Sequence, residues 1–234
     1  MCLRIWNIYH AKAREKRVIL QGTNVNFLGD SITEGDGVTM ETRFTALLSQ
    51  RYDMLCHNYG ICGTRIARQS RPSQYPHHDL DFCMRADDME SDADAVVVFG
   101  GTNDFGHGDA PFGDFSDRTV DTFCGALHVL YRKLLEKYPS SLIVICTPLH
   151  RSTERIPRWD GHILDDFVQM IRKTAEYYSL PVLDLYAISG MQPDVPVIKE
   201  KLMPDGLHPN EEGHKILAEL IGTFLERAPE RIRL

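Results

Sequence analysis

The sequence contains no run that approaches the roughly 20 apolar residues needed to span a bilayer. Residues 1–20 mix polar and apolar side chains, and basic residues interrupt any apolar stretch, so they do not have the form of a secretory signal peptide. With 26 basic and 33 acidic residues the formal net charge is -7, which disfavours nucleic acid or an anionic membrane surface as the main partner. We therefore expect a cytoplasmic protein that binds neither nucleic acid nor membranes.

Cysteine patterns typical of metal sites are also missing. The six cysteines include no Cys-x-x-Cys pair, and their spacing matches no zinc ribbon or zinc finger. Cys56, Cys124 and Cys146 lie in apolar runs, where free thiols behave as small hydrophobic side chains and indicate a reducing compartment. His77 and His78 lie near two aspartates, but no second spaced cluster accompanies them, so a solvated turn is expected. No metal and no cofactor are predicted.

What the sequence does contain is a regular alternation of strand and helix patterns across 234 residues, of which 43% are hydrophobic. Strands are expected at residues 24–28, 54–59, 93–99, 142–147 and 181–185. Helices are expected at residues 39–52, 79–89, 117–138, 163–178 and 209–224, and long loops at 100–117 and 191–206. This alternation predicts an α/β fold with a five-stranded parallel sheet and helices on both faces. We expect a single domain over residues 21–234, preceded by an extension at residues 1–20.

Residues 27–35 are expected to organise the chain. An apolar strand ends at Gly29 and a turn or short helix begins at Ser31, so the serine is presented at the end of a strand. In open parallel sheets, ligands bind beyond the carboxyl ends of the strands, which makes Ser31 a candidate nucleophile. The structural alternative is that Ser31 only caps the helix, with Glu34 completing a capping box.

Other segments are expected at the same edge of the sheet, and each supplies a group that acyl transfer needs. His208 is the candidate general base, because an imidazole titrates near neutral pH. Asp205 is the carboxylate that would hold this imidazole in one tautomer. The oxyanion formed on attack requires preorganised donors. The candidates are the Ser31 N–H, the Gly60 N–H and the Asn103 side-chain amide.

Each of these residues also has a structural alternative. Gly60 would end its strand in either case. Asn103-Asp104 and Asp205 both fit common turn sequences, and His208 is one of ten histidines that otherwise cap helices or lie on the surface. The case for a site rests on the combination, because separate segments each bring a fitting residue to the same predicted edge.

These motifs resemble those of the SGNH superfamily, also called GDSL-type esterases and lipases. Residues 29–35, Gly-Asp-Ser-Ile-Thr-Glu-Gly, resemble its first motif, with Ile32 where the family name has Leu. Residues 58–63 resemble the second motif, residues 101–104 match the third, and residues 205–209 match the final Asp-x-x-His-Pro motif. The resemblance extends over residues 24–224, and the motifs occur in the family's order.

The resemblance implies a flavodoxin-like three-layer α/β/α sandwich and metal-independent ester hydrolysis through an acyl-serine intermediate. It carries the family's oxyanion glycine onto Gly60 and its asparagine onto Asn103. The family's serine turn differs from the Gly-x-Ser-x-Gly elbow of α/β-hydrolases, which does not occur in this sequence. Family members cleave lipids, acetylated sugars, thioesters and other acyl esters.

Five further residues are candidates for substrate binding, namely Asp30, Arg65, Asp104, His150 and Trp159. Arg65 would orient an anionic group or a sugar hydroxyl, and Trp159 would stack on a sugar face. Their structural alternatives are a surface arginine and an aromatic side chain that packs its own loop. His107, in the loop after Asn103, is expected to be exposed, as most loop histidines are.

We predict a serine esterase that hydrolyses small acyl esters, with O-acetylated carbohydrates as candidate substrates. A metal-dependent phosphoesterase is one alternative, with Asp30, Asn103, Asp104 and His208 as ligands, although hard cations would require more carboxylates. A non-catalytic ligand-binding module of the same fold is the other. A binding module has no need of a base beside a hydroxyl, which favours the esterase.

Overall fold

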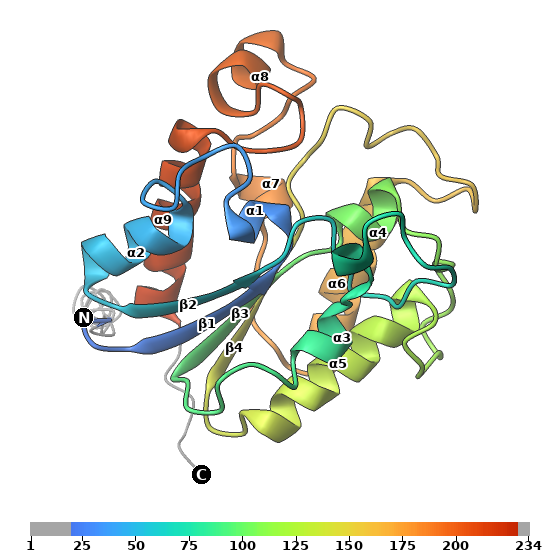
Figure 1. Ribbon diagram of the computed structural model, residues 1–234, viewed down its shortest axis with the longest axis horizontal. Helices are drawn as coiled ribbons and strands as arrows, with labels where there is room; N and C mark the ends of the chain where they lie inside the picture. The colour runs from blue at the N-terminus through green and yellow to red at the C-terminus, as the bar shows by residue number, and fades with distance from the viewer. Residues whose placement is uncertain (1–19, 229–234) are drawn as a thin grey trace, which may run out of the picture.

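The computed structural model describes residues 20–228 and contains one parallel sheet covered by helices (Figure 1). Its strands are β1 (Asn24–Gly29), β2 (Leu55–Gly60), β3 (Ala95–Phe99), β4 (Leu142–Cys146) and β5 (Val182–Leu183). They lie in the order β2-β1-β3-β4-β5, and every pairing is parallel. This is the strand order of flavodoxin-like sheets, so the predicted five-stranded α/β fold is confirmed. The predicted extension at residues 1–20 lies outside the described residues except for Leu20.

Helices cover both faces of the sheet (Figure 1). One face carries α2 (Phe44–Tyr52) and α9 (Glu211–Arg227), and the other carries α3 (Phe82–Arg85), α5 (Phe123–Lys137) and α6 (Leu164–Tyr177). Shorter elements lie in the connections, and these are α1 (Ser31–Glu34), η1 (Pro76–Asp79), α4 (Thr102–Gly106), α7 (Leu185–Ile188) and α8 (Pro196–Leu202). No helix within residues 20–228 is long and apolar enough to cross a membrane.

The strand sequences explain the two layers of core. Side chains alternate along a strand, so neighbouring residues of β3 face opposite sides of the sheet. Val96 and Val98 pack with the α3, α5 and α6 side, whereas Val97 and Phe99 pack with the α2 and α9 side. All four are at most 3% exposed. A continuous apolar run is therefore required, because neither face of this strand meets water.

Several predicted element boundaries were wrong. The loop predicted at residues 100–117 contains α4, and the loop predicted at residues 191–206 contains α8. The helix predicted at residues 79–89 is replaced by η1 and the short α3. The last helix begins at Glu211 rather than in the predicted first turn at Pro209, because Asn210 caps it through a bond from the Gly213 N–H. His208 therefore lies in the connection before α9.

The sheet register determines where the connecting loops begin. Gly29, the last residue of β1, lies opposite Gly60 of β2 and Phe99 of β3. These three neighbouring strands therefore end at the same level, and the chain leaves all of them at one edge. The sheet order reverses direction here, since β1 lies between β2 and β3, and such a point is where open α/β sheets bind ligands.

Candidate active site

The α1 turn places Ser31 at this edge. Asp30, not Ser31, is the N-cap, because its carboxylate accepts the Ile32 N–H at 3.1 Å. The turn closes at Gly35, which adopts a left-handed φ of 102° and donates its N–H to the Ser31 carbonyl. Ser31 is thus the first helical residue, and within residues 20–228 its own N–H has no hydrogen-bond acceptor. The alternative reading of Ser31 as a cap was wrong.

Ser31, His208 and Asp205 form a continuous hydrogen-bonded chain. The Ser31 Oγ lies 3.0 Å from the His208 Nε2, and the His208 Nδ1 lies 2.6 Å from the Asp205 Oδ2. A carboxylate can only accept, so Nδ1 carries the proton and Nε2 is left to accept from the serine hydroxyl. The structure thus brings together a hydroxyl, an imidazole and a carboxylate from two segments far apart in the sequence, in the arrangement that a serine nucleophile requires.

The turn before α9 is built around the Asp205 carboxylate. Its Oδ1 accepts the N–H groups of Leu207 at 2.8 Å and of His208 at 2.7 Å, and Gly206 supplies the left-handed φ of 80° that this turn requires. Burial raises the pKa of Asp205, but the hydrogen bonds from the His208 N–H, the His208 ring and the Leu207 N–H outweigh it, so the net pKa is lowered. Asp205 therefore stays ionised beside the imidazole at neutral pH.

A second carboxylate approaches the same imidazole. The Asp36 Oδ2 lies 3.7 Å from the His208 Nε2, on the side where Ser31 also lies. The Asp36 N–H donates to the Ser31 carbonyl, which fixes the backbone of this residue next to α1. Asp36 was not among the residues predicted for the site, although its position directly after the motif at residues 29–35 was a usable signal.

The Asn103 amide is fixed in place close to this edge. Asn103 is 4% exposed, and its Nδ2 donates to the Thr64 carbonyl at 3.0 Å. Its Oδ1 lies 3.1 Å from the His107 Nε2. One hydrogen of the Asn103 Nδ2 is therefore used inside the protein, and the other has no acceptor among residues 20–228.

Gly60 differs from the expectation for an oxyanion donor. Its N–H donates to the Asn58 Oδ1 at 2.8 Å, so it already has a partner within the protein. A Cβ at this position would clash with the backbone of Thr33 and Glu34. Glycine is thus required here because α1 packs directly against the end of β2.

Three of the expected substrate-binding residues are buried and bonded within the protein. Asp30, Arg65 and Asp104 are 2%, 5% and 3% exposed. The two carboxylate oxygens of Asp104 accept the N–H groups of Ile66 and Ala67, both at 2.9 Å. Burial is the main cause that raises the pKa of Asp30 and of Asp104 to about 6. Direct substrate contact by these side chains is therefore not supported. Each instead forms hydrogen bonds with backbone groups near the site.

The other two candidates, His150 and Trp159, lie in the connection between β4 and α6. The His150 Nδ1 pairs with the Glu154 Oε2 at 2.8 Å, and its ring lies 3.8 Å from that of Tyr186. Trp159 is 67% exposed. It borders a surface pocket of about 270 Å³ whose other lining residues are Ser70, Arg71 and Asp109.

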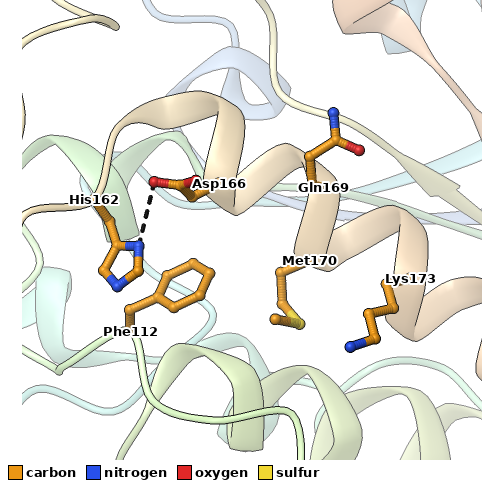
Figure 2. A pocket seen from close by; sticks show the side chains of 6 residues that line it. All are labelled: Phe112, His162, Asp166, Gln169, Met170 and Lys173. Atoms are coloured by element: carbon orange, nitrogen blue, oxygen red, sulfur yellow. Dashed lines mark hydrogen bonds and ion pairs between the residues drawn. The ribbon is translucent and has the colours of Figure 1, made fainter.

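A second surface pocket, of about 220 Å³, lies between α6 and the segment that carries Phe112 (Figure 2). The His162 ring stacks on Phe112 at 4.0 Å and pairs with Asp166. None of the residues predicted for the active site lines this pocket. Within residues 20–228, no three His, Cys, Asp or Glu side chains converge as a metal site would require.

Comparisons with known proteins identify the family of this chain. Residues 27–216 match the GDSL-like lipase/acylhydrolase family. The chain is 24% identical over 212 residues to an acetylxylan esterase of Xylanibacter ruminicola, and the match covers 85% of this chain but only 42% of that protein.

Solved structures support the fold over most of the chain. A Lactobacillus plantarum protein is 29% identical, with a TM-score of 0.75, and the match covers 88% of this chain and 97% of that one. The crystal structure of an acetyl xylan esterase, AlAXEase, is 22% identical, with a TM-score of 0.60 and coverage of 85% and 98%. At that identity the second likeness concerns the fold alone.

Proposed function

Because this chain belongs to the GDSL-like lipase/acylhydrolase family, we propose that it is a serine esterase with Ser31 as its nucleophile. His208 serves as the general base, and Asp205 orients its ring. The observation that carries this proposal is the hydrogen-bonded chain from the Ser31 Oγ through the His208 ring to the Asp205 Oδ2, with distances of 3.0 and 2.6 Å. Such a chain gives a serine hydroxyl the proton acceptor that it needs.

The reaction follows from these positions. As the Ser31 Oγ attacks the ester carbonyl carbon, its proton passes to the His208 Nε2. The tetrahedral intermediate breaks its bond to the alcohol oxygen, which takes the proton back from Nε2, and an acyl-serine remains. Water then attacks the acyl-serine with His208 again as base, which releases the acid and restores Ser31. Asp205 stabilises the imidazolium in both halves without taking its proton.

The oxyanion of the tetrahedral intermediate requires donors on the side opposite the base. The Ser31 N–H and the second Asn103 Nδ2 hydrogen are preorganised for this role, because neither has an acceptor among residues 20–228. The Gly60 N–H takes part if substrate binding displaces or shares its bond to the Asn58 Oδ1. Gly60 is thus the weakest of the three proposed donors.

We place small acyl esters of polar alcohols, including O-acetylated carbohydrates, as the substrates, and we propose that no metal takes part. The Xylanibacter ruminicola relative is an acetylxylan esterase, and its match to this chain covers 42% of that longer protein. In this chain, Trp159 is exposed next to Arg71 and Asp109, which offers a ring face and polar groups to a sugar. The alternatives of a phosphoesterase and a binding module have no comparable support.

The test is hydrolysis of 4-nitrophenyl acetate by the full chain, with and without EDTA. Ser31→Ala and His208→Ala are expected to lower kcat by about 10³-fold or more, because both act on the same proton transfer. Ser91→Ala is the matched control, since Ser91 is exposed. A serine-directed organophosphonate should add its mass to Ser31. Full activity of Ser31→Ala would overturn the proposal, and loss of activity in EDTA that added metal restores would favour the phosphoesterase.

A further inference from the structure

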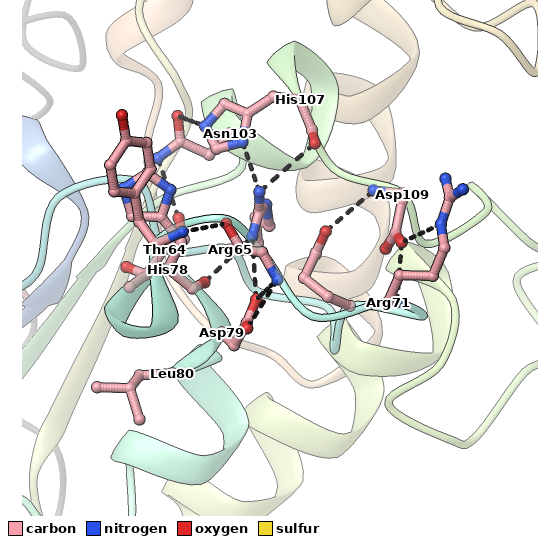
Figure 3. A network of polar contacts seen from close by, with 12 residues as sticks. Thr64, Arg65, Arg71, His78, Asp79, Leu80, Asn103, His107 and Asp109 are labelled. Carbon is pink, nitrogen blue, oxygen red and sulfur yellow. Dashed lines mark hydrogen bonds and ion pairs between the residues drawn. The ribbon is translucent and has the colours of Figure 1, made fainter.

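Two side chains, the buried Arg65 and the exposed His107, lead to the Asn103 amide (Figure 3). The Arg65 Nη2 lies 2.6 Å from the His107 Nδ1, and the His107 Nε2 lies 3.1 Å from the Asn103 Oδ1. The Asn103 Nδ2 in turn donates to the Thr64 carbonyl at 3.0 Å. His107 is exposed, as the sequence predicted, yet both of its ring nitrogens are hydrogen bonded.

The two end groups of this series of hydrogen bonds, the Arg65 guanidinium and the Thr64 carbonyl, determine where each hydrogen between them lies. A guanidinium can only donate, so the His107 Nδ1 must accept from Arg65. The proton of the neutral ring is then on Nε2, and it is donated to the Asn103 Oδ1. At the other end a carbonyl can only accept, so Thr64 requires the Asn103 nitrogen on its side. Both ends therefore select the same orientation of the Asn103 amide.

This orientation matters because an asparagine side chain can turn by half a revolution about its last bond. In the observed orientation the free Nδ2 hydrogen is available to a developing oxyanion. In the turned orientation the amide would present an oxygen instead, which would repel the negative charge. The Thr64 carbonyl and the His107 Nε2–H each disfavour the turned orientation, since it would bring like groups together.

The Arg65 guanidinium is itself anchored. Its Nη1 donates to the His78 carbonyl at 3.1 Å and lies 4.0 Å from the Asp79 Oδ1. Arg65 is 5% exposed, so it has little freedom to leave His107. Desolvation and the nearby cationic groups of Arg65, His78 and Arg151 also lower the pKa of His107 to about 4, so its ring stays neutral at neutral pH.

We propose that Arg65 and His107 are positioning residues that hold the Asn103 amide with its N–H toward the oxyanion. Neither touches substrate, and both act through Asn103. This inference rests on the proposed esterase function, because it assigns how one of its oxyanion donors is oriented. It replaces the substrate-binding role that the sequence suggested for Arg65.

A double-mutant cycle on kcat for 4-nitrophenyl acetate tests the proposal. Asn103→Ala should lower kcat by about 10²–10³-fold, the usual cost of one oxyanion donor. His107→Leu should lower kcat by about tenfold with KM changed less than about twofold, since ground-state binding is untouched. Adding His107→Leu to Asn103→Ala should cost less than about twofold more, because the residue acted upon is gone.

Further variants separate a positioning role from an effect on folding. His107→Gln should keep kcat within about threefold of the wild type, because a glutamine amide can accept from Arg65 and donate to Asn103. His77→Leu, the same substitution at a neighbouring exposed histidine, should leave kcat unchanged. Should His107→Leu fail to fold, His107→Glu takes its place. It has the same shape as His107→Gln and accepts from Arg65, but at neutral pH it has no proton to donate to Asn103. An additive loss in the Asn103→Ala background overturns the proposal.

One readout is independent of any activity. Imidazole ¹⁵N NMR of the wild type at neutral pH, assigned by the signals lost in His107→Gln, should show a neutral ring with its proton on Nε2. A proton on Nδ1 would overturn the proposed positioning of Asn103 by Arg65 and His107, even if the protein is an esterase. Conversely, if Ser31→Ala keeps full activity, the proposed function is wrong, and the tautomer of His107 still decides how Asn103 is held.

Discussion

Two carboxylates flank the His208 imidazole, and the proposed mechanism gives them very different weights. The Asp205 Oδ2 lies 2.6 Å from Nδ1, and the Asp36 Oδ2 lies 3.7 Å from Nε2. Their side chains are almost equally exposed, at 53% and 51%. Asp205→Asn and Asp36→Asn therefore remove the same charge, with the same change of shape, from the two sides of one ring. The second variant is a matched control for the first.

Asp205→Asn is expected to lower kcat/KM by about 10³–10⁴-fold. The N–H groups of Leu207 and His208 both point at the Asp205 Oδ1, so they retain the asparagine oxygen on their side. The asparagine nitrogen then faces the His208 Nδ1 and donates to it. The ring proton moves to Nε2, which can no longer accept from the Ser31 hydroxyl, so the base is lost.

Asp36→Asn should change kcat/KM by only about fivefold or less. Two unit charges at 3.7 Å attract by about 1 kcal/mol in a medium like water, and pairs this exposed usually deliver less. The assay is hydrolysis of 4-nitrophenyl acetate at neutral pH and fixed salt, with the unfolding midpoint of each variant as a check on folding. Equal losses in the two variants, or retention of more than a tenth of the activity by Asp205→Asn, would refute the assigned roles.

Three other perturbations test how the site is supported. Gly60→Ala should lower the free energy of unfolding by about 1–3 kcal/mol in urea and should also lower kcat. The added Cβ would clash with the Glu34 backbone and displace α1. Unchanged stability would contradict this packing. Arg85→Met should lower the free energy of unfolding by about 3 kcal/mol in the same measurement. Arg85 is 6% exposed, and its Nη2 donates to the Gly29 carbonyl at 2.9 Å. A loss below about 0.5 kcal/mol would mean that water takes over this hydrogen bond. Burial raises the pKa of Asp104 to about 6, so the folded state binds more protons than the unfolded chain between pH 4 and 6, and stability is lost as pH rises through this range. Relative to Asp104→Asn, the wild type should therefore lose about 2 kcal/mol of unfolding free energy from pH 4 to pH 7. A difference independent of pH would contradict the raised pKa.

The predicted fold was largely correct because its signals are local. The apolar run at residues 95–99 requires a strand that is buried on both faces, whatever surrounds it. The long amphipathic patterns near α5 and α6 likewise predicted those helices to within a few residues at most ends. Short elements such as α4 and α8 were missed, since a helix of one or two turns has too few residues for a period to show.

Within the site, residue type and order predicted which side chains to examine, because acyl transfer needs a hydroxyl, an imidazole, a carboxylate and neutral donors. The contact between Ser31 and His208 is separated by 177 residues and exists because β1 and the turn before α9 meet at one edge of the sheet. No local sequence pattern predicts a contact between residues so far apart in the chain. Arg85 likewise donates to the carbonyl groups of Gly29 and Tyr59 and so links the ends of β1 and β2. Its place in a predicted helix did not suggest this role.

Sequence alone thus determined the alternation of elements and the chemical groups at the strand ends, since both are written in side-chain type and short-range period. The fold in three dimensions decided which of those groups are buried, which hydrogens are already used, and which nitrogen of each histidine carries its proton. The Arg65 guanidinium and the Asn103 amide owe their positions to partners about 40 residues away in the chain, His107 and Thr64. Hydrogen bonding and desolvation depend on those neighbours, and a linear order of residues does not contain them.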